Sequence, residues 1–479
     1  MPYNVPQNID HDKIFLVNFS ELEGRWDPTI FQNQFRFVSK QYTNRKLSSV
    51  ALIDPKVSFS KLKDDDDISF IPMNIVNEDD GTIKESLYKK VLETKGFTRF
   101  QNGDLIWAKI TPCMQNGKSA VVRNLRNGYG CGSTEFFVIR PKSDDLLIDY
   151  IYIILRDNRF LQTATKYFGG SAGQQRVPKN FLENLIIPIL PLHIQQQIVD
   201  VYNAALSLRK KKLSVSKAKL ASIDKYLLDE LGITLPQKDN SLEKRIFTVN
   251  FSKVGGRRLD PFYNNLIYSQ IEDNTNKGKF KCVKLKKLCT YTSGVVYSSK
   301  DVANEGHAIL RANNINLETN DLNLSDIRYI DSNIVLPDSL RLKKDDIFIC
   351  AASGSKEHAG KVAFIDTDTS FYFGGFMGVL RINNEEIMSY YLFEYLASIM
   401  FKETLYRNLG GTNINNINFE MIKNIKIPLP PLEKQREIAN NISAIRAEAK
   451  RLEQEGEEIL QSARLQVEQM ILGEKDIEG

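Results

Sequence analysis

The sequence is poor in the residues that cross-link a chain or anchor it in a membrane. It has five cysteines and four histidines in 479 residues. No two cysteines form a C-x-x-C pair and the histidines lie far apart, so neither a disulfide framework nor a zinc site is expected. Nowhere do about 18 apolar residues follow one another, and the N-terminus lacks a basic segment followed by an apolar run. We therefore expect a cytoplasmic protein that is neither secreted nor membrane-spanning and that binds no metal.

The motifs of nucleotide-binding and methyl-transferring enzymes are also missing. Gly117, Lys118 and Ser119 match the end of a phosphate-binding loop, but Pro112 stands where that loop needs a glycine. The glycine-rich residues 128–132 precede a strand-like segment and not the helix N-terminus that a dinucleotide needs. No Asn-Pro-Pro-Tyr or Asp-Pro-Pro-Tyr of the amino-methyltransferases occurs. We therefore expect a non-catalytic chain that has no catalytic residues and binds no cofactor of its own.

The chain does have the length and apolar content for more than one domain. Because a hydrophobic core stops growing beyond about 250 to 300 residues, 479 residues predict at least two domains. Hydrophobic residues make up 42% and charged residues 26%, as in ordinary globular proteins. The net charge of +5 permits binding to nucleic acid without requiring it.

The chain also repeats itself. Residues 14–20 read IFLVNFS and recur as IFTVNFS at 246–252, and an Asp-Pro follows each block. Further along, residues 169–198 are echoed by 410–438, which share Gly-Gly, Ile-Pro-x-x-Pro-Leu and a glutamine three residues later. The middle of each copy matches only in its strand-like runs. This pattern predicts two copies of one framework whose loops have diverged.

Each copy divides into two physically different parts. About 150 residues of short β-branched and aromatic runs, separated by Gly, Asn and Asp turns, predict a mixed domain with many short strands. A short helical pair closed by Gly-Gly follows. Pro191 and Pro431 then open a long helix, because proline fits the first turn of a helix and not its interior. The predicted fold class is α+β, with two mixed α/β domains in tandem repeat, each followed by a long helix.

Both long helices carry an apolar stripe whose steps of three and four residues are typical of a coiled coil. The stripe of the first helix comprises Ile198, Tyr202, Ala205, Leu220, Ile223, Leu227 and Leu231, and that of the second comprises Ile438, Ile442, Ile445, Ala449, Leu452, Ile459 and Ala463. Residues 209–219 hold six basic and no acidic side chains, whereas 449–459 hold two basic and four acidic ones. We expect the two helices to pair through the stripes, with charge biasing the choice of partner but not the direction.

This layout resembles the specificity subunits of type I restriction-modification systems over essentially the whole chain. The most specific element is IPLPPLEKQREI at 427–438, which reads IPILPLHIQQQI at 187–198. The resemblance implies two target-recognition domains whose helices form an antiparallel coiled coil, and a dyad between the helices also suits two related domains that face a duplex alike. The expected boundaries are 1–190 for the first target-recognition domain, 191–233 for the first spacer helix, 234–246 for a linker, 247–430 for the second domain and 431–473 for the second spacer helix.

The resemblance also implies partners. The chain would bind double-stranded DNA, read a bipartite and asymmetric target, and dock two methyltransferase (modification) subunits, together with two restriction subunits where the system has them. Transfer of a methyl group from S-adenosylmethionine to adenine would belong to the modification subunit. Cleavage that needs ATP and Mg would belong to the restriction subunit.

Candidate DNA-contacting residues lie in the loops that differ between the copies. Base edges in the major groove favour Arg and Lys on guanine, Asn and Gln on adenine, and Ser or Thr on either. The first copy has these types at Lys109, Thr111, Gln115, Asn116 and Lys118, and after Gly-Gly at Ser171, Gln174, Gln175 and Arg176. The second copy has them at Arg311, Asn313, Asn314, Ser353, Ser355, Lys356, His358, Thr412, Asn413, Asn415 and Asn416.

Other functions stay open at this point. The chain could serve a stand-alone or type II-like methyltransferase complex, or be a DNA-modifying enzyme whose motifs are not recognised. Incubation of the chain alone with labelled S-adenosylmethionine and DNA discriminates an enzyme from a reader. A third function is that of a coiled-coil adaptor that reads no DNA, for which a salt-dependent DNA-binding assay decides.

Overall fold

The computed structural model describes residues 37–169, 174–237, 241, 243, 246–250, 260–354, 357–409, 415–417 and 419–474. The first repeated block, residues 14–20, lies outside these residues. The chain divides into two compact units. Unit one comprises Met1–Lys211 with Glu455–Gly479, and unit two comprises Lys212–Gln454. Each unit is described by itself below.

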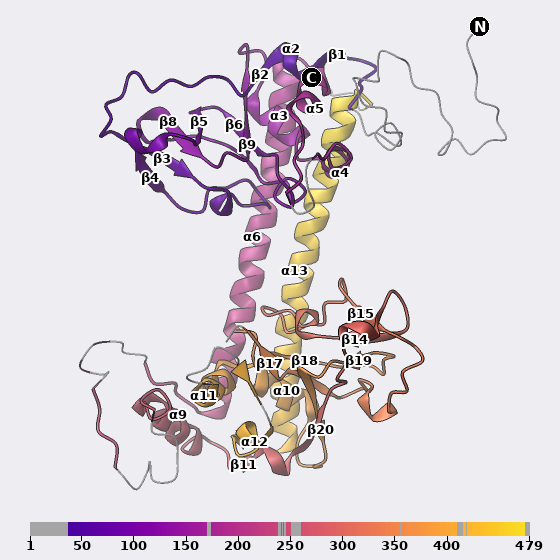
Figure 1. The fold of residues 1–479 in the computed structure, drawn as a ribbon. Coiled ribbons are helices and arrows are strands. Elements are labelled where there is room, and N and C mark those ends of the chain that lie inside the picture. The colour runs from indigo at the N-terminus through magenta and orange to yellow at the C-terminus, as the bar shows by residue number, and fades with distance from the viewer. Residues whose placement is uncertain are drawn as a thin grey trace, which may run out of the picture. The chain divides into compact units, whose positions relative to one another are not determined.

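Unit one contains two four-stranded sheets, in the orders β2-β9-β6-β7 and β4-β3-β8-β5, and a two-stranded ladder of β1 with β10. Its helices α3, α4 and α5 follow the sheets, and the first half of α6 belongs to it as well (Figure 1). The bounds are β1 Thr43–Lys46, α2 Leu47–Val50, β2 Ala51–Ile53, β3 Asp67–Ile71, β4 Leu87–Lys90, β5 Thr98–Gln101, β6 Leu105–Ala108, β7 Ser119–Val121, β8 Tyr129–Gly132, β9 Phe136–Pro141, α3 Ile148–Ile154, α4 Asn158–Thr165, α5 Lys179–Asn184, β10 Ile186–Ile189 and α6 Leu192–Leu231.

Unit two is built in the same way. Its four-stranded sheets have the orders β12-β20-β16-β18 and β13-β15-β14-β19, and β11 pairs with β22 and β17 with β21. The bounds are α9 Leu266–Asn276, β11 Cys282–Lys284, β12 Cys289–Ser293, β13 Val302–Ala303, β14 His307–Leu310, β15 Arg328–Ile330, β16 Ile347–Cys350, β17 Ala352–Ser353, β18 Val362–Phe364, β19 Tyr372–Phe373, β20 Met377–Ile382, α10 Ser389–Ala397, α11 Ile399–Leu409, β21 Asn415–Asn416, α12 Phe419–Ile422, β22 Lys426–Pro428 and α13 Leu432–Leu472.

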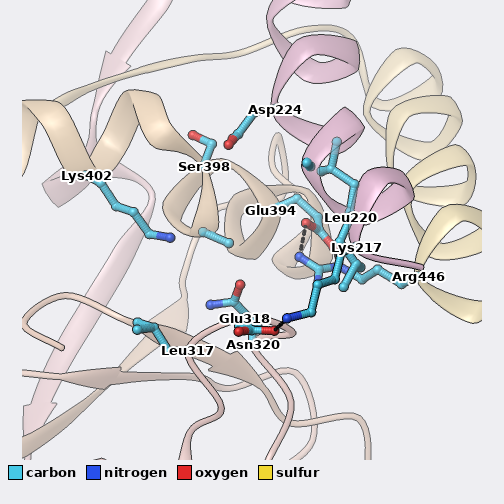
Figure 2. A pocket seen from close by; sticks show the side chains of 13 residues that line it. Lys217, Leu220, Asp224, Leu317, Glu318, Asn320, Glu394, Ser398, Lys402 and Arg446 are labelled. Carbon is cyan, nitrogen blue, oxygen red and sulfur yellow. Dashed lines mark hydrogen bonds and ion pairs between the residues drawn. The ribbon is translucent and has the colours of Figure 1, made fainter. Parts of the chain in front are cut away.

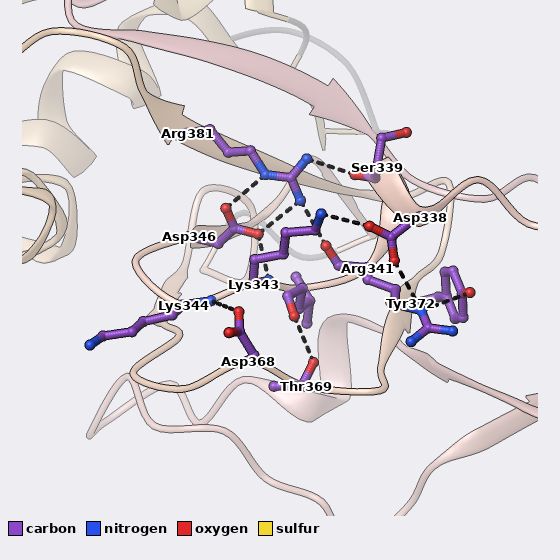
Figure 3. Close-up of polar contacts among 11 residues, drawn as sticks. Asp338, Ser339, Arg341, Lys343, Lys344, Asp346, Asp368, Thr369, Tyr372 and Arg381 are labelled. Atoms are coloured by element: carbon purple, nitrogen blue, oxygen red, sulfur yellow. Dashed lines mark hydrogen bonds and ion pairs between the residues drawn. The ribbon is translucent and has the colours of Figure 1, made fainter.

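A buried ion pair marks the same place in both units. In unit one the β9 residue Arg140 donates to both carboxylate oxygens of Asp104, at 2.6 and 2.8 Å. In unit two Arg381 on β20 does the same to Asp346, at 2.8 and 2.9 Å, and also donates to the carbonyl of Ser339 (Figure 3). Each carboxylate stands just before the central strand. The matching sheets and ion pairs confirm the predicted tandem repeat.

The central strands β6 and β16 are buried on both faces. Leu105 and Trp107 belong to a core with α3 and α6, whereas Ile106 belongs to a second core with the other sheet. In unit two Ile347 and Phe348 divide in the same way. A strand with two covered faces reads as a continuous apolar run and does not alternate, which explains LIWA and IFIC in the sequence.

The long helices pair in antiparallel fashion within each unit. In unit one Ile198 and Tyr202, early in α6, share a core with Val467 and Met470, late in α13. In unit two the end of α6 shares a core with the start of α13, where Ser216, Tyr226 and Glu230 contact Glu453, Asn441 and Lys434 in turn. The stripes predicted from the sequence are buried or half-buried throughout. The antiparallel coiled coil is therefore confirmed.

The two oppositely charged windows of the helices also meet, as predicted. Arg209 of α6 lies 2.6 Å from a carboxylate oxygen of Glu457 on α13, within unit one. Glu457 is about half exposed, and an exposed pair of this kind stabilises a protein by only ~0.2 to 1 kcal/mol. The ion pair therefore adds little to stability, which the buried stripe provides.

A buried glutamine joins each strand-rich domain to its long helix. Gln195 is fully buried; its side chain accepts a hydrogen bond from the backbone N–H of Leu147 at 2.8 Å and donates to the carbonyls of Asp145 and Leu190. Gln435 in unit two is fully buried as well and makes the same three bonds, with Met388, Glu386 and Pro430. The glutamine that both copies share after Ile-Pro-x-x-Pro-Leu therefore fixes the helix to the loop before α3 or α10.

In the described part of the chain, no helix is long and apolar enough to span a membrane. The same residues contain no group of three or more His, Cys, Asp or Glu side chains that could hold a metal ion. All five cysteines are free, and burial raises the pKa of the Cys131 thiol to about 11 and that of Cys289 to about 12.

We expect Gln195→Leu to lower the free energy of unfolding by about 3 kcal/mol, because each buried polar group left without a partner costs ~1 to 3 kcal/mol. Urea denaturation of the full chain measures the change. Gln197→Leu is the matched control, since Gln197 lies on the exposed face of the same helix and should change stability by no more than about 0.5 kcal/mol. Equal shifts from the two variants would contradict a structural role for Gln195.

Candidate nucleic-acid interface

Two segments distant in sequence pair beside the end of the central strand in unit one. The strand-end segment, residues 109–111, follows β6, and the return segment, residues 174–177, follows the Gly-Gly. Ile110 and Arg176 form a β-bridge. The backbone N–H of Thr111 donates to the carbonyl of Gln175 at 3.0 Å, and that of Val177 donates to the carbonyl of Lys109 at 2.9 Å. The structure thereby brings together four of the predicted site residues, Lys109, Thr111, Gln175 and Arg176.

An ion pair organises the charge on this surface. Arg176 donates to both carboxylate oxygens of Glu135, each at 2.8 Å. These hydrogen bonds lower the pKa of Glu135, and the positive charge of Lys109 adds to the effect. The Lys109 ammonium lies 5.1 Å from the centre of the Phe137 ring. Arg176 keeps about two fifths of its side chain exposed, so the guanidinium remains accessible at the surface.

The rest of the first predicted cluster lies on the turn that joins β6 to β7. Gln115 and Asn116 are exposed. The Thr111 hydroxyl donates to the side-chain oxygen of Gln115 at 2.6 Å, and the Asn116 amide lies 3.4 Å from a carboxylate oxygen of Glu78. Lys118 is half-buried and points to the carbonyl of Met73 at 3.4 Å. Its predicted DNA contact therefore competes with a role in holding the neighbouring loop.

Unit two repeats the arrangement with other side chains. Its strand-end segment is residues 351–353 and its return segment is residues 415–417. Ser353 of β17 pairs with Asn415 of β21, and the N–H of Ile417 donates to the carbonyl of Ala351. Asn416, the partner of Ala352, takes the place that Arg176 has in unit one. His358 is half-buried in the turn before β18. The predicted residues Ser171, Ser355, Lys356, Thr412 and Asn413 lie outside the described residues.

A third loop follows β14, and two of the predicted residues there have opposite environments. Asn313 is exposed and its amide donates to Asp326 at 2.6 Å, and Arg311 lies 2.9 Å from the same carboxylate. Asn314 is fully buried; it accepts from the N–H of Arg311 and donates to the carbonyls of Asn323 and Asp326. The Asn314 side chain therefore makes three hydrogen bonds to the backbone of its own loop. We assign Asn314 to loop structure and not to base contact.

Buried cations fix this third loop to the body of each unit. In unit two Lys361 donates to the carbonyl of Ile315 at 2.8 Å, and burial lowers its pKa. Arg446 of α13 forms a two-bond ion pair with buried Glu394 and donates to the carbonyl of Thr319 at 2.5 Å. Arg446 and Glu394 also line a cavity of about 320 Å³ in unit two, and Figure 2 shows the two side chains against each other.

The corresponding loop of unit one is held from a different element. Arg156, which follows α3, donates to the carbonyls of Gly117, Glu78 and Asp79 at 2.5 to 2.8 Å. A backbone β-bridge closes the loop in each unit, Val76 with Ile83 and Ile315 with Leu322.

Sequence reasoning missed several residues of this surface. Exposed Asn74 follows β3 as Asn313 follows β14, and an alignment of MNIVN with ANNIN would have found it. Glu135 carried no signal of its own, because its role depends on Arg176, which lies 41 residues further along. Phe376 occupies the place of Glu135 in unit two, since the N–H groups of Lys109 and Ala351 donate to the carbonyls of Glu135 and Phe376 respectively.

The loops present exposed hydrogen-bond donors and acceptors, and the sheets hold these loops in place. Lys, Arg, Asn, Gln and Ser are the side chains that pair with base edges and phosphates. The repeated surface therefore suits recognition of a polar ligand at two places along one chain.

Comparison with known proteins places these units in a family context. A family model described as the type I restriction modification DNA specificity domain matches residues 39–212 and 277–461. The chain is 38% identical over 197 residues to the specificity subunit of the type I restriction enzyme EcoAI from Escherichia coli, covering 40% of this chain and 33% of that protein. It is 25% identical over 306 residues to the MjaVIII specificity subunit from Methanocaldococcus jannaschii, covering 63% of each. The matched part thus spans about a third of the length of the E. coli relative.

A solved structure shows the same fold. A chain from a study of the complex assembly and conformational transition of the type I R-M system superposes with a TM-score of 0.52 at 16% identity. The superposition covers 91% of this chain and 97% of the other.

The opposite environments of Asn313 and Asn314 generate a stability prediction. Asn314→Ala should lower the free energy of unfolding by about 2 kcal/mol, because it leaves buried backbone groups without partners. Asn313→Ala removes one exposed hydrogen bond and should change stability by no more than about 0.5 kcal/mol. Thermal unfolding of the two full-length variants measures both, and a larger loss at Asn313 would overturn the assignment.

Proposed function

The chain belongs to the family of the type I restriction modification DNA specificity domain, and from this premise we propose that it is the specificity subunit of a type I restriction-modification complex. It binds duplex DNA and reads a bipartite, asymmetric target. The observation that carries the proposal is the repeated surface, which we call the reading surface. In each unit it forms where a strand-end segment and a return segment meet beside the central strand.

The residue types on this surface support DNA as the ligand. Unit one offers Arg176 and Lys109, which suit guanine and phosphate, and unit two offers Asn415 and Asn416, whose residue type suits adenine. Because the scaffold is shared and the side chains differ, each unit would read a different half-site. Two different half-sites on one chain make the target asymmetric.

The partners follow from the same proposal. The chain itself is non-catalytic and binds no cofactor. Two modification subunits bind S-adenosylmethionine and methylate adenine, and two restriction subunits, where the system has them, use ATP and Mg. The complex acts on DNA in the cytoplasm.

The helices support a target with a fixed spacer. The 40 residues of α6 measure about 60 Å at ~1.5 Å per residue, the length of roughly 18 base pairs at ~3.4 Å each. Each recognition domain overlaps its helix, which shortens the reach. We place the half-site centres about one helical turn apart, ~10 base pairs.

The isolated chain should bind S-adenosylmethionine and ATP negligibly and transfer no methyl group to DNA. The physical reason is that no glycine-rich loop of the sequence meets a helix N-terminus in the way that these nucleotides need. Isothermal calorimetry and labelled S-adenosylmethionine test both statements. Micromolar affinity for either nucleotide, or methylation by the chain alone, would favour an enzyme.

Exchanging residues 1–185 for the equivalent segment of a relative should change one half-site and leave the other intact, because each unit carries its own reading surface. Deleting one heptad from both helices is the matched control: it should change the spacer and neither half-site. Methylation mapping by single-molecule sequencing of DNA from cells that contain the complex reports both results. A continuous or palindromic target, or an exchange that rewrites both halves, would end the proposal.

A further inference from the structure

Two positions on the reading surface can be matched between the units from the backbone alone. Both matches follow from one backbone hydrogen bond. The N–H of Lys109 donates to the carbonyl of Glu135 at 2.9 Å, and the N–H of Ala351 donates to that of Phe376 at 2.9 Å. Lys109 therefore corresponds to Ala351, and Glu135 to Phe376.

The segments that follow β2 and β12 contribute to the same surface. In unit one Ser58 lines a cavity together with Lys109, and in unit two Val296 lies beside Gly375, the neighbour of Phe376. Strand register does not reach Ser58 or Val296, because the ladder of β2 ends at Ile53 and that of β12 ends at Ser293.

The side chains on this part of the surface are polar in unit one and apolar in unit two. Unit one has Ser58, Lys109 and Glu135, and a cavity of about 580 Å³ lined by Ser58, Lys109 and Lys56 lies there. Unit two has Val296, Ala351 and Phe376. Val296 is 91% exposed and Phe376 is 74% exposed, among the most exposed large apolar side chains of the described residues. We call Val296 and Phe376 the apolar pair.

The apolar pair lies between the polar segments of the reading surface. Val296 is next to Gly375, where a Cβ would come within 3.2 Å of the valine methyl. The carbonyl of Phe376 accepts from Ala351 and from Ala352, which adjoins Ser353. The N–H of Gly374 donates to the carbonyl of Leu310, which precedes the loop that carries Arg311 and Asn313. The pair is therefore continuous with the surface that carries the donors and acceptors.

We propose that Val296 and Phe376 contact the C5-methyl group of a thymine in the half-site that unit two reads. The thymine methyl is the apolar group that base pairs present in the major groove, and apolar side chains recognise it by contact. In the half-site of unit one, the polar trio of Ser58, Lys109 and Glu135 reads hydrogen-bonding groups instead. This inference rests on the proposed function and names the chemistry by which its two half-sites differ.

Uracil tests the inference, because replacing thymine by uracil removes the methyl group and keeps every hydrogen-bonding atom. The probe is a duplex with the mapped target, in which each thymine of both half-sites is replaced in turn. The full chain is assembled with its modification subunits, and the dissociation constant is measured at one salt concentration. We expect at least one uracil in the half-site of unit two to weaken binding about fourfold, the factor that corresponds to burial of one methyl group.

The variant Val296→Ser with Phe376→Ser should bind the thymine duplex more weakly than the original chain and should no longer distinguish it from the uracil duplex. Val335→Ser is the matched control, since Val335 is 93% exposed in the same unit but on the loop before β16. It should keep the full preference for thymine. Thermal unfolding of each variant shows that the fold is retained, and the uracil series on the unaltered chain needs no variant.

Each of the remaining outcomes contradicts one specific claim. If the complex binds its target and no uracil of the unit-two half-site weakens it, the thymine contact is wrong and the proposed function stands. If the double variant fails to assemble with the modification subunits while the uracil series has no effect, the apolar pair is a protein-docking surface. If the unaltered complex shows no preference for any target over random DNA, the proposed function itself fails.

Discussion

The buried glutamine at each domain–helix junction is the contact on which the rest of the architecture depends. Gln195 and Gln435 each connect the first turn of a long helix to the loop before a domain helix and to the short segment between a β-strand and the long helix. At the same junctions the hydroxyls of Tyr150 and Tyr391 donate to the backbone carbonyls of Pro188 and Pro428. A helix held at its first turn leaves its domain in one direction and with one face inward. That fixed face lets a stripe of Ile and Leu serve both the domain core and the partner helix.

The residues that hold the reading surface in place differ from the exposed side chains that would contact DNA. Strands buried on both faces end at the surface, and buried Lys361 and half-buried Arg446 hold the third loop by its carbonyl groups. A bond to a backbone carbonyl does not depend on the side chain of the residue that is held. Exposed side chains of this loop can therefore vary without loss of the loop. The return segments are likewise paired through their backbones, and Arg176 and Asn416 occupy the same backbone position in the two units.

The sequence predicted the parts that repeat or follow a period. The tandem copies, the apolar stripes and the complementary charges of the helices were readable because each is a pattern along the chain. For the site, the sequence predicted only which regions of the chain contribute and not which residues. Asn314 has the same side chain as Asn313, and only burial separates a loop-forming amide from an exposed one. Glu135 and Phe376 occupy equivalent positions, as the backbone hydrogen bonds show, although their residue types are unrelated. Roles of this kind depend on long-range pairing, which no local pattern encodes.

The correspondence between the units also limits how specificity can change. The same carbonyl that bonds to the strand-end segment belongs to Glu135 in one unit and to Phe376 in the other, so the backbone leaves the choice of side chain there open. In unit one the choice affects a second residue, because Arg176 donates to both carboxylate oxygens of Glu135. Replacing Glu135 alone would leave the guanidinium without that partner and free its donors for another acceptor. Specificity in unit one should therefore change by paired substitutions, whereas an apolar side chain in unit two can change alone, since dispersion contacts carry no partner requirement.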